Sequence, residues 1–270
     1  MSDTHAILDR TQGLGVNHER HDPDVPHQFD DLAQKNEVDT LGMWTFLATE
    51  VLFFGGLFGA LTVYRFLYFD SFHEGSEHLY KWIGFINTGV LLCSSFTVVL
   101  SVHAAKEGNN NQLILWLAAT VLCGLTFLGI KAVEYTIDFH ENLIPNSQYF
   151  GMEPDAAQAN HDDKISRLEA WKESGWKWTD ADNPTDISRA NEATIFMRHA
   201  MLFYVFYYTM TAIHALHMVI GLVIFGILIY RAKHNHYTPR AHAQIEIVGL
   251  YWHFVDIVWL FLFPLLYLIR

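Results

Sequence analysis

Positive charge is scarce in this sequence. The 270 residues include 17 Lys and Arg against 29 Asp and Glu, which gives a formal net charge of −12 at pH 7. Proteins that bind nucleic acid usually carry a basic patch or stripe that neutralises phosphates. We therefore exclude nucleic acid as a partner of this chain.

Cysteine is also rare. The only two cysteines, Cys93 and Cys123, are far apart in the sequence, and both fall within apolar stretches. They form no CxxC or CxxCH motif, the patterns that indicate a thiolate metal site, a redox pair or haem attachment. We expect both thiols to be packing residues.

Charge is almost absent from five long apolar stretches. A helix needs about 20 apolar residues to cross the ~30 Å hydrocarbon core of a bilayer. Because the backbone must satisfy its own hydrogen bonds in lipid, each stretch is expected to be helical. We predict an all-α fold, a polytopic membrane helical bundle of about five transmembrane helices, at Leu41–Phe69, Trp82–Val102, Leu113–Phe139, His199–Tyr230 and Ile245–Ile269.

Polar segments divide the chain into four parts. We predict a polar N-terminal tail over 1–40, helices 1–3 over 41–139, an acidic extramembrane segment over 140–198 and helices 4–5 over 199–270. The acidic segment holds 11 Asp or Glu against 6 Lys or Arg, and it is either a solvated loop or carries a short surface helix. The basic loop at 231–243 predicts a cytoplasmic N-terminus and a C-terminus outside, because basic loops stay on the cytoplasmic side.

Ionisable residues inside the predicted spans are the candidate functional residues, because such groups are costly in a membrane. Glu50 lies on the first span with Phe46, Phe53, Phe54 and Leu57 beside it. Burial in apolar surroundings disfavours a carboxylate, so we expect Glu50 to be protonated at neutral pH. It serves either as a proton relay or as a neutral packing residue with a hydrogen bond. Nearby, Gly55 and Gly59 form a GxxxG motif that would permit close approach of another helix.

Two further pairs lie at helical spacing. Lys131 and Glu134, three residues apart, are expected to form a structural ion pair, and Lys131 can also extend toward the membrane surface because it is near a helix end. His214 and His217 are also three apart. They could bind metal or haem, but the pair lacks further ligands, so hydrogen bonds across a helix interface are favoured.

The last span carries a polar stripe of Glu246, Gly249, His253 and Asp256. Asp256 near the middle of a span needs a partner, for which His253 or a histidine of the preceding span would serve. We predict one buried polar network that fixes how the last two helices dock. Its members are His214, His217, Glu246, His253 and Asp256.

None of these groups forms a nucleophile with a base, a phosphate loop or a complete metal site. From the residues alone we predict a membrane protein with no catalytic residue and no metal site. An alternative is a stand-alone proton-coupled transporter that uses Glu50 and Asp256. Such a protein usually has broken helices or paired repeats, and neither is visible in the sequence.

Several runs resemble subunit III of haem-copper respiratory oxidases, the cytochrome c oxidase subunit III family. The resemblance covers roughly 41–139 and 199–269, in the order of the family and within the predicted spans. Five helices are similar to the shorter bacterial form. The runs that carry the resemblance are TEVLFF at 49–54, NTGVLL at 87–92, Glu134-Tyr135, HALHMVIG at 214–221 and YWHFVDIVWLFL at 251–262.

The resemblance implies a subunit of a terminal oxidase that passes electrons from cytochrome c or quinol to oxygen. Haem and copper are then held by subunits I and II, and this chain carries no cofactor of its own. It would stabilise subunit I, bind phospholipid and support proton uptake in the bacterial plasma membrane. Glu50 matches the carbodiimide-reactive carboxyl of the family, and Arg231 and His236 match lipid-headgroup positions. The segment 140–198 is longer than is usual in the family, so another subunit or an electron-donor protein is expected to contact it.

Overall fold

The computed structural model describes residues 32–140, 187–234 and 243–269, and every regular element in these ranges is a helix. Five helices are long and apolar enough to span a membrane. The predicted all-α, multi-span fold is therefore confirmed. The long helices are α2 (Leu32–Leu67), α4 (Lys81–Lys106), α5 (Asn110–His140), α7 (Ile187–Lys233) and α8 (Ala243–Tyr267).

Two of these helices begin well before the predicted positions. The helix α2 starts nine residues before Leu41, and α7 starts twelve residues before His199. The added turns are polar, so hydropathy excluded them, yet their residues include good helix formers and Lys35 pairs with Asp39 at 2.6 Å. Both helices exceed the length that crosses the hydrocarbon, so each extends beyond it. The possible surface helix within 140–198 falls on residues outside the described ranges.

A short helix, α3 (Phe69–Glu77), occupies the segment predicted as a loop between the first two spans. Its inner face is buried against α7, where Tyr204 donates a hydrogen bond to the Gly75 carbonyl at 3.1 Å. A Cβ at Gly75 would lie 2.7 Å from Phe203, so the two helices approach closely at this glycine. The nine-residue helix is too short and too polar for the hydropathy pattern to reveal it.

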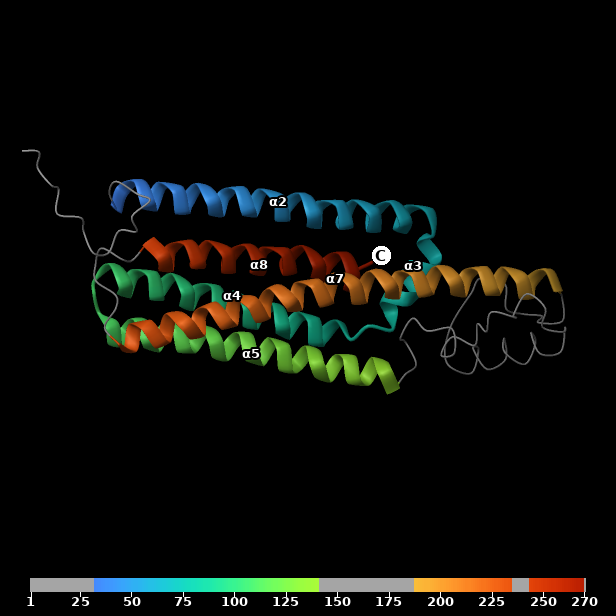
Figure 1. Cartoon of the computed structure of the whole chain (residues 1–270). Coiled ribbons are helices and arrows are strands. Elements are labelled where there is room, and N and C mark those ends of the chain that lie inside the picture. Colours follow the sequence, from blue (N-terminus) through green and yellow to red (C-terminus); the bar gives the residue numbers. More distant parts are fainter. Residues whose placement is uncertain (1–31, 141–186, 235–242, 270) are drawn as a thin grey trace, which may run out of the picture. The chain divides into compact units, whose positions relative to one another are not determined.

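The helices α4, α5, α7 and α8 form a ring in which each packs against two others (Figure 1). The contacts run from α4 to α5 and α8, and from α7 to α5 and α8. Half of the most apolar window of α8 is buried, against 28% or less in the other spans. The helix α8 is therefore the most buried of the described spans, and Asp256 is among its buried residues.

Two glycines on neighbouring helices pack closely against the ring of Trp252 on α8. A Cβ at Gly124 on α5 would lie 3.1 Å from its ring, and one at Gly221 on α7 would lie 2.7 Å from it. Two glycines thus make room for one fully buried indole between three helices. By contrast, Gly55 and Gly59 of α2 have no atom within 4 Å of their added Cβ positions, so no described helix approaches the GxxxG motif.

The chain divides into two compact units, Met1–Trp44 and Thr45–Arg270. All contacts of the four-helix ring lie within the second unit. Within this unit, α2 contacts the ring through aromatic side chains, with Phe54 against His217 and Phe254. The helix thereby brings Glu50, one turn before Phe54, toward α7.

Candidate functional site

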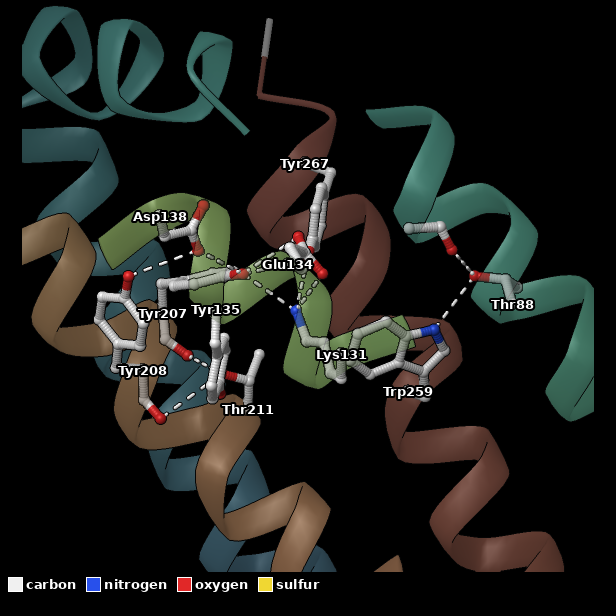
Figure 2. Close-up of polar contacts among 11 residues, drawn as sticks. Thr88, Lys131, Glu134, Tyr135, Asp138, Tyr207, Tyr208, Thr211, Trp259 and Tyr267 are labelled. Atoms are coloured by element: carbon white, nitrogen blue, oxygen red, sulfur yellow. Dashed lines mark hydrogen bonds and ion pairs between the residues drawn. The ribbon is translucent and has the colours of Figure 1, made fainter. Parts of the chain in front are cut away.

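Lys131 is the centre of a buried polar cluster between α5, α7 and α8 (Figure 2). Its side chain is 3% exposed, and its ammonium donates to Glu134 Oε2 at 2.8 Å, Tyr207 Oη at 3.0 Å and Tyr267 Oη at 2.6 Å. An ammonium has three N–H donors, so each has an acceptor. Its position near a helix end suggested that Lys131 could extend toward the membrane surface. The structure shows instead that its ammonium is held inside the bundle.

Both carboxylate oxygens of Glu134 also have hydrogen-bond partners. Its Oε2 faces Lys131, while its Oε1 accepts from Tyr267 at 2.5 Å and from Tyr207 at 3.1 Å. The carboxyl is completely buried. A buried charge is tolerated when it is paired and its remaining lone pairs are hydrogen-bonded, and both conditions hold here.

Asp138 lies one turn further along α5 and is also fully buried. Its Oδ2 lies 3.4 Å from the hydroxyls of Tyr207 and Tyr208, and its Oδ1 has no hydrogen-bond partner among the described residues. The Tyr207 hydroxyl has one proton, but Glu134, Asp138 and the Tyr267 hydroxyl all lie within reach as acceptors. Asp138 is therefore the acid of this group with the fewest hydrogen-bond donors. With two acids and one lysine, the cluster is electrically neutral when one acid carries a proton.

Aromatic rings complete the surroundings of the ammonium. Lys131 Nζ lies 4.7 Å from the centroid of the Tyr207 ring and 5.3 Å from that of Trp259, within the range of cation–π attraction. Trp259 in turn donates to Thr88 Oγ1 at 3.1 Å, which connects α4 to the same region (Figure 2). We call Lys131, Glu134, Asp138, Tyr207, Tyr208 and Tyr267 the Lys131 cluster.

Sequence spacing pointed to only part of this cluster. The sequence indicated the i,i+3 relation of Lys131 and Glu134, but not Asp138, which lies on the same face at i+7. The tyrosine hydroxyls arrive from helices 76 and 136 residues away, and spacing along one helix carries no information about them. The i, i+3, i+7 row of charged residues was the available signal.

Glu50 meets a histidine rather than an entirely apolar neighbourhood. Its Oε2 lies 3.3 Å from His217 Nε2 on α7, without the alignment of a hydrogen bond. His217 Nδ1 lies 2.9 Å from the Ile213 carbonyl, which can only accept, so this nitrogen carries a proton. The other nitrogen, Nε2, is the one that faces the Glu50 carboxyl.

His214 is fully buried but is not hydrogen-bonded, contrary to the expected role of the two histidines. Its ring packs against those of Phe127 and Trp259, and neither ring nitrogen has a hydrogen-bond partner within the described part of the chain. His217 points to α2 instead. Two residues three apart differ by about 60° around a helix, which is enough to separate their neighbours in this bundle.

The predicted single network of five residues is wrong, because its members have separate partners. Glu246 pairs with Lys106 at 2.7 Å near the start of α8. His253 bonds to Ser95 at 2.7 Å, and Ser94 Oγ lies 3.5 Å from Asp256 Oδ2.

The reason is that the polar stripe of α8 faces α4 rather than α7. A Cβ at Gly249, in the middle of the stripe, would contact Val98 and Val102 of α4. Periodicity defines the face of a helix but not the helix that packs against it.

Of the two predicted lipid-headgroup residues, only Arg231 lies within the described ranges, near the end of α7. Arg231 is exposed and donates to Gln244 at 3.2 Å, which connects α7 to the start of α8. His236 lies outside the described residues, so the lipid-headgroup assignment of the two residues stays a prediction. Cys93 is exposed rather than packed, and Cys123 is half-buried.

One group in the described ranges has ligand-type atoms close together. His73, Glu74 and Glu77 on α3 present such atoms within 4.8 Å of one another. Neighbouring acids on a short helix are common without an ion. Neither His214 nor His217 belongs to a group of this kind among the described residues.

Comparisons with known proteins agree on one family. The family model described as cytochrome c oxidase subunit III matches residues 190–269. A probable cytochrome c oxidase subunit 3 from Nocardia farcinica is 28% identical over 86% of this chain and 88% of its own length. The corresponding proteins of Thermostichus vulcanus and Alkalihalophilus pseudofirmus are 27% and 26% identical, over 85% and 84% of this chain and 86% and 85% of their own lengths.

Proposed function

Because the chain belongs to the cytochrome c oxidase subunit III family, we propose that it is a non-catalytic subunit of a proton-pumping haem-copper terminal oxidase. The observation that carries this proposal is the similarity to curated relatives over 86% of the chain and 88% of the relative. Haem and copper are assigned to partner subunits, and electrons pass there from cytochrome c or quinol to oxygen.

The proposed contribution of this chain is to stabilise subunit I. A stabilising subunit needs a rigid body, and the Lys131 cluster supports that role. Its hydrogen bonds connect α5 with α7 and α8, and they give the ammonium of Lys131 and both oxygens of Glu134 partners inside the chain. Buried polar groups that are satisfied in this way rigidify a core.

Glu50 is the residue we propose for supporting proton uptake. Glu50 and His217 bring together a carboxyl and an imidazole, two side-chain types that commonly transfer protons in proteins. Asp138 and Asp256 are less suited, because no imidazole or ammonium lies within ion-pair distance of either carboxylate in the described ranges. The reactive carboxyl implied by the family is thus one that faces an imidazole.

Lipid and partner contacts complete the proposal. Phospholipid headgroups are assigned to Arg231 and His236, where a guanidinium near the membrane edge suits a phosphate. The segment 140–198 is assigned to contact another subunit or an electron-donor protein. The protein is placed in a bacterial plasma membrane with its N-terminus in the cytoplasm and its C-terminus outside.

Purification of the native complex through a tag on this chain tests the proposal. We expect co-purification of haem-containing subunits, an oxidase absorption spectrum and oxygen uptake with cytochrome c or quinol. Deletion of the chain should leave a complex that still reduces oxygen but loses activity faster during turnover. A tagged complex with no haem and no oxygen uptake would refute the oxidase assignment.

A further inference from the structure

A groove opens on the outer side of the α4–α8 pair. It encloses about 200 Å³ and has an aliphatic rim, with Leu92 on α4 and Ile257 and Leu260 on α8 all exposed. Its floor is polar, with Ser95 and Asp256 among the lining residues. Thr88 and Trp259 form part of the wall and are connected by a hydrogen bond (Figure 2).

Asp256 lines this groove, and one of its carboxyl oxygens has no hydrogen-bond donor among the described residues. It is 8% exposed, and its Oδ1 has no partner among the described residues. Its Oδ2 lies 3.5 Å from Ser94 Oγ, but the single proton of that hydroxyl is already donated to the Leu91 carbonyl at 2.8 Å. Each hydroxyl has only one proton to give, so Ser94 is a weak partner at most.

The neighbouring donors are committed elsewhere too. Trp252 Nε1 donates to Ser94 Oγ at 3.0 Å, and Trp259 Nε1 donates to Thr88 Oγ1 at 3.1 Å. Thr88 gives its own proton to the Gly84 carbonyl at 2.8 Å. Ser95 Oγ lies 2.7 Å from His253 Nδ1, so this hydroxyl is shared with an imidazole. Asp256 Oδ1 is therefore left without a partner in the described part of the α4–α8 interface, and buried polar atoms without partners are rare.

The depth of Asp256 restricts what can supply the missing donor. It lies 13 residues after Ala243 and 11 residues before Tyr267 in α8. At roughly 1.5 Å per residue these separations are about 20 Å and about 16 Å, so the carboxyl is near the middle of the span. Lipid headgroups lie at the membrane surface, and acyl chains have no hydrogen-bond donor. A protein side chain at mid-membrane depth meets the requirement.

We propose that the α4–α8 groove seats a transmembrane helix of another oxidase subunit, whose side chain donates a hydrogen bond to Asp256. The inference rests on the proposed function, because membership of an oxidase supplies the partner. The helix inserts a hydroxyl, amide or ammonium group between Leu92 and Leu260, and its apolar residues cover the rim. In a bilayer, packing and hydrogen bonds of this kind drive helix association.

Photo-crosslinking in the intact complex tests directly whether a helix of another subunit binds in the α4–α8 groove. A photoreactive phenylalanine analogue at Leu260, which is 48% exposed on the rim, should capture a transmembrane peptide of another oxidase subunit. The same analogue at Leu122 of α5, which is 66% exposed, controls for non-specific capture. Mass spectrometry of the adducts distinguishes a partner peptide from phospholipid and from a second copy of this chain.

The hydrogen bond is tested with paired substitutions. Asp256→Asn keeps an acceptor oxygen, whereas Asp256→Leu removes it at similar volume. We expect Asp256→Leu to release the subunit from detergent-solubilised complex about threefold faster than Asp256→Asn, the factor for one hydrogen bond of average strength between membrane helices. The thermal midpoint of the separated full chain should be similar in both variants, because Asp256 has only weak internal contacts.

The outcomes separate this inference from the proposed function. Capture of a partner peptide at Leu260 but not at Leu122 supports the seat. Adducts only with phospholipid or a second copy, or equal capture of one peptide at both positions, overturn it while the complex remains an oxidase. Equal release of the two Asp256 variants overturns the hydrogen bond. A tagged chain that purifies without haem-containing subunits instead overturns the proposed function and this inference with it.

Discussion

Lys131→Met removes the ammonium of the Lys131 cluster while keeping the length and most of the volume of the side chain. The carboxyl of Glu134, fully buried, then loses its cation but keeps the hydroxyls of Tyr207 and Tyr267. Breaking a buried pair by removing one partner costs about 3–5 kcal/mol, whereas single hydrogen bonds between membrane helices average about 0.6 kcal/mol. Because two hydroxyls remain, we expect a loss of about 3 kcal/mol in the free energy of unfolding.

The assay is equilibrium unfolding of the purified full chain by sodium dodecyl sulfate in mixed micelles. Lys106→Met is the matched control, because Lys106 and Glu246 form a pair of the same kind at 2.7 Å with side chains 55% and 37% exposed. Exposed pairs contribute about 0–1 kcal/mol, so this variant should remain within about 1 kcal/mol of the wild type.

The double variant Lys131→Met with Glu134→Gln tests the charge itself. It removes both charges and should recover about 1–2 kcal/mol relative to Lys131→Met alone, within the range of coupling energies between contacting residues. If Lys131→Met destabilises the chain no more than Lys106→Met, the reasoning that the cluster holds a desolvated ion pair is refuted.

Three further predictions use other parts of the bundle. Gly221→Ala should lower the free energy of unfolding by about 1–3 kcal/mol, because its Cβ would lie 2.7 Å from the Trp252 ring. Gly226→Ala, whose Cβ would have no atom within 4 Å, should be neutral or stabilising. Equal effects of the two variants in the same detergent titration would argue against close packing of Gly221 on Trp252. Tyr267→Phe removes a donor to Glu134 and an acceptor for Lys131, so a loss of about 1–3 kcal/mol is expected, and an unchanged unfolding curve would contradict the contacts. Glu50→Gln should assemble normally in blue native gels, because a neutral amide of the same size can occupy the site beside His217, but it should abolish carbodiimide labelling of this chain. Failed assembly would indicate that Glu50 is ionised and paired.

The transmembrane helices could be predicted because length and apolarity together leave few alternatives in a bilayer. The extended ends of α2 and α7 were missed since they are polar turns that continue a helix beyond the hydrocarbon, where hydropathy gives no signal. The short helix α3 was missed for the same reason: it has few large apolar residues and its burial depends on α7.

The candidate site was predictable only as far as single helices define it. Spacing identified Lys131 with Glu134 and the polar stripe of α8, because these relations lie within one helix. It did not show that His217 faces Glu50 on α2, nor that His253 and Asp256 face serines of α4. Ser94 and Ser95 attract no attention in the sequence, since a hydroxyl in an apolar helix can bond to its own backbone, as Ser94 does.

The order in which the Lys131 cluster forms follows from where its members lie along the chain. Glu134 is three residues from Lys131, while Tyr207 and Tyr267 follow 76 and 136 residues later. When α5 is inserted into the membrane during synthesis, neither hydroxyl is yet present, and an unpaired lysine at the centre of a membrane helix costs about 2.5–3.5 kcal/mol on insertion scales. Glu134 can pair with Lys131 within α5 from the start, and the two tyrosines add their hydrogen bonds once α7 and α8 have been inserted.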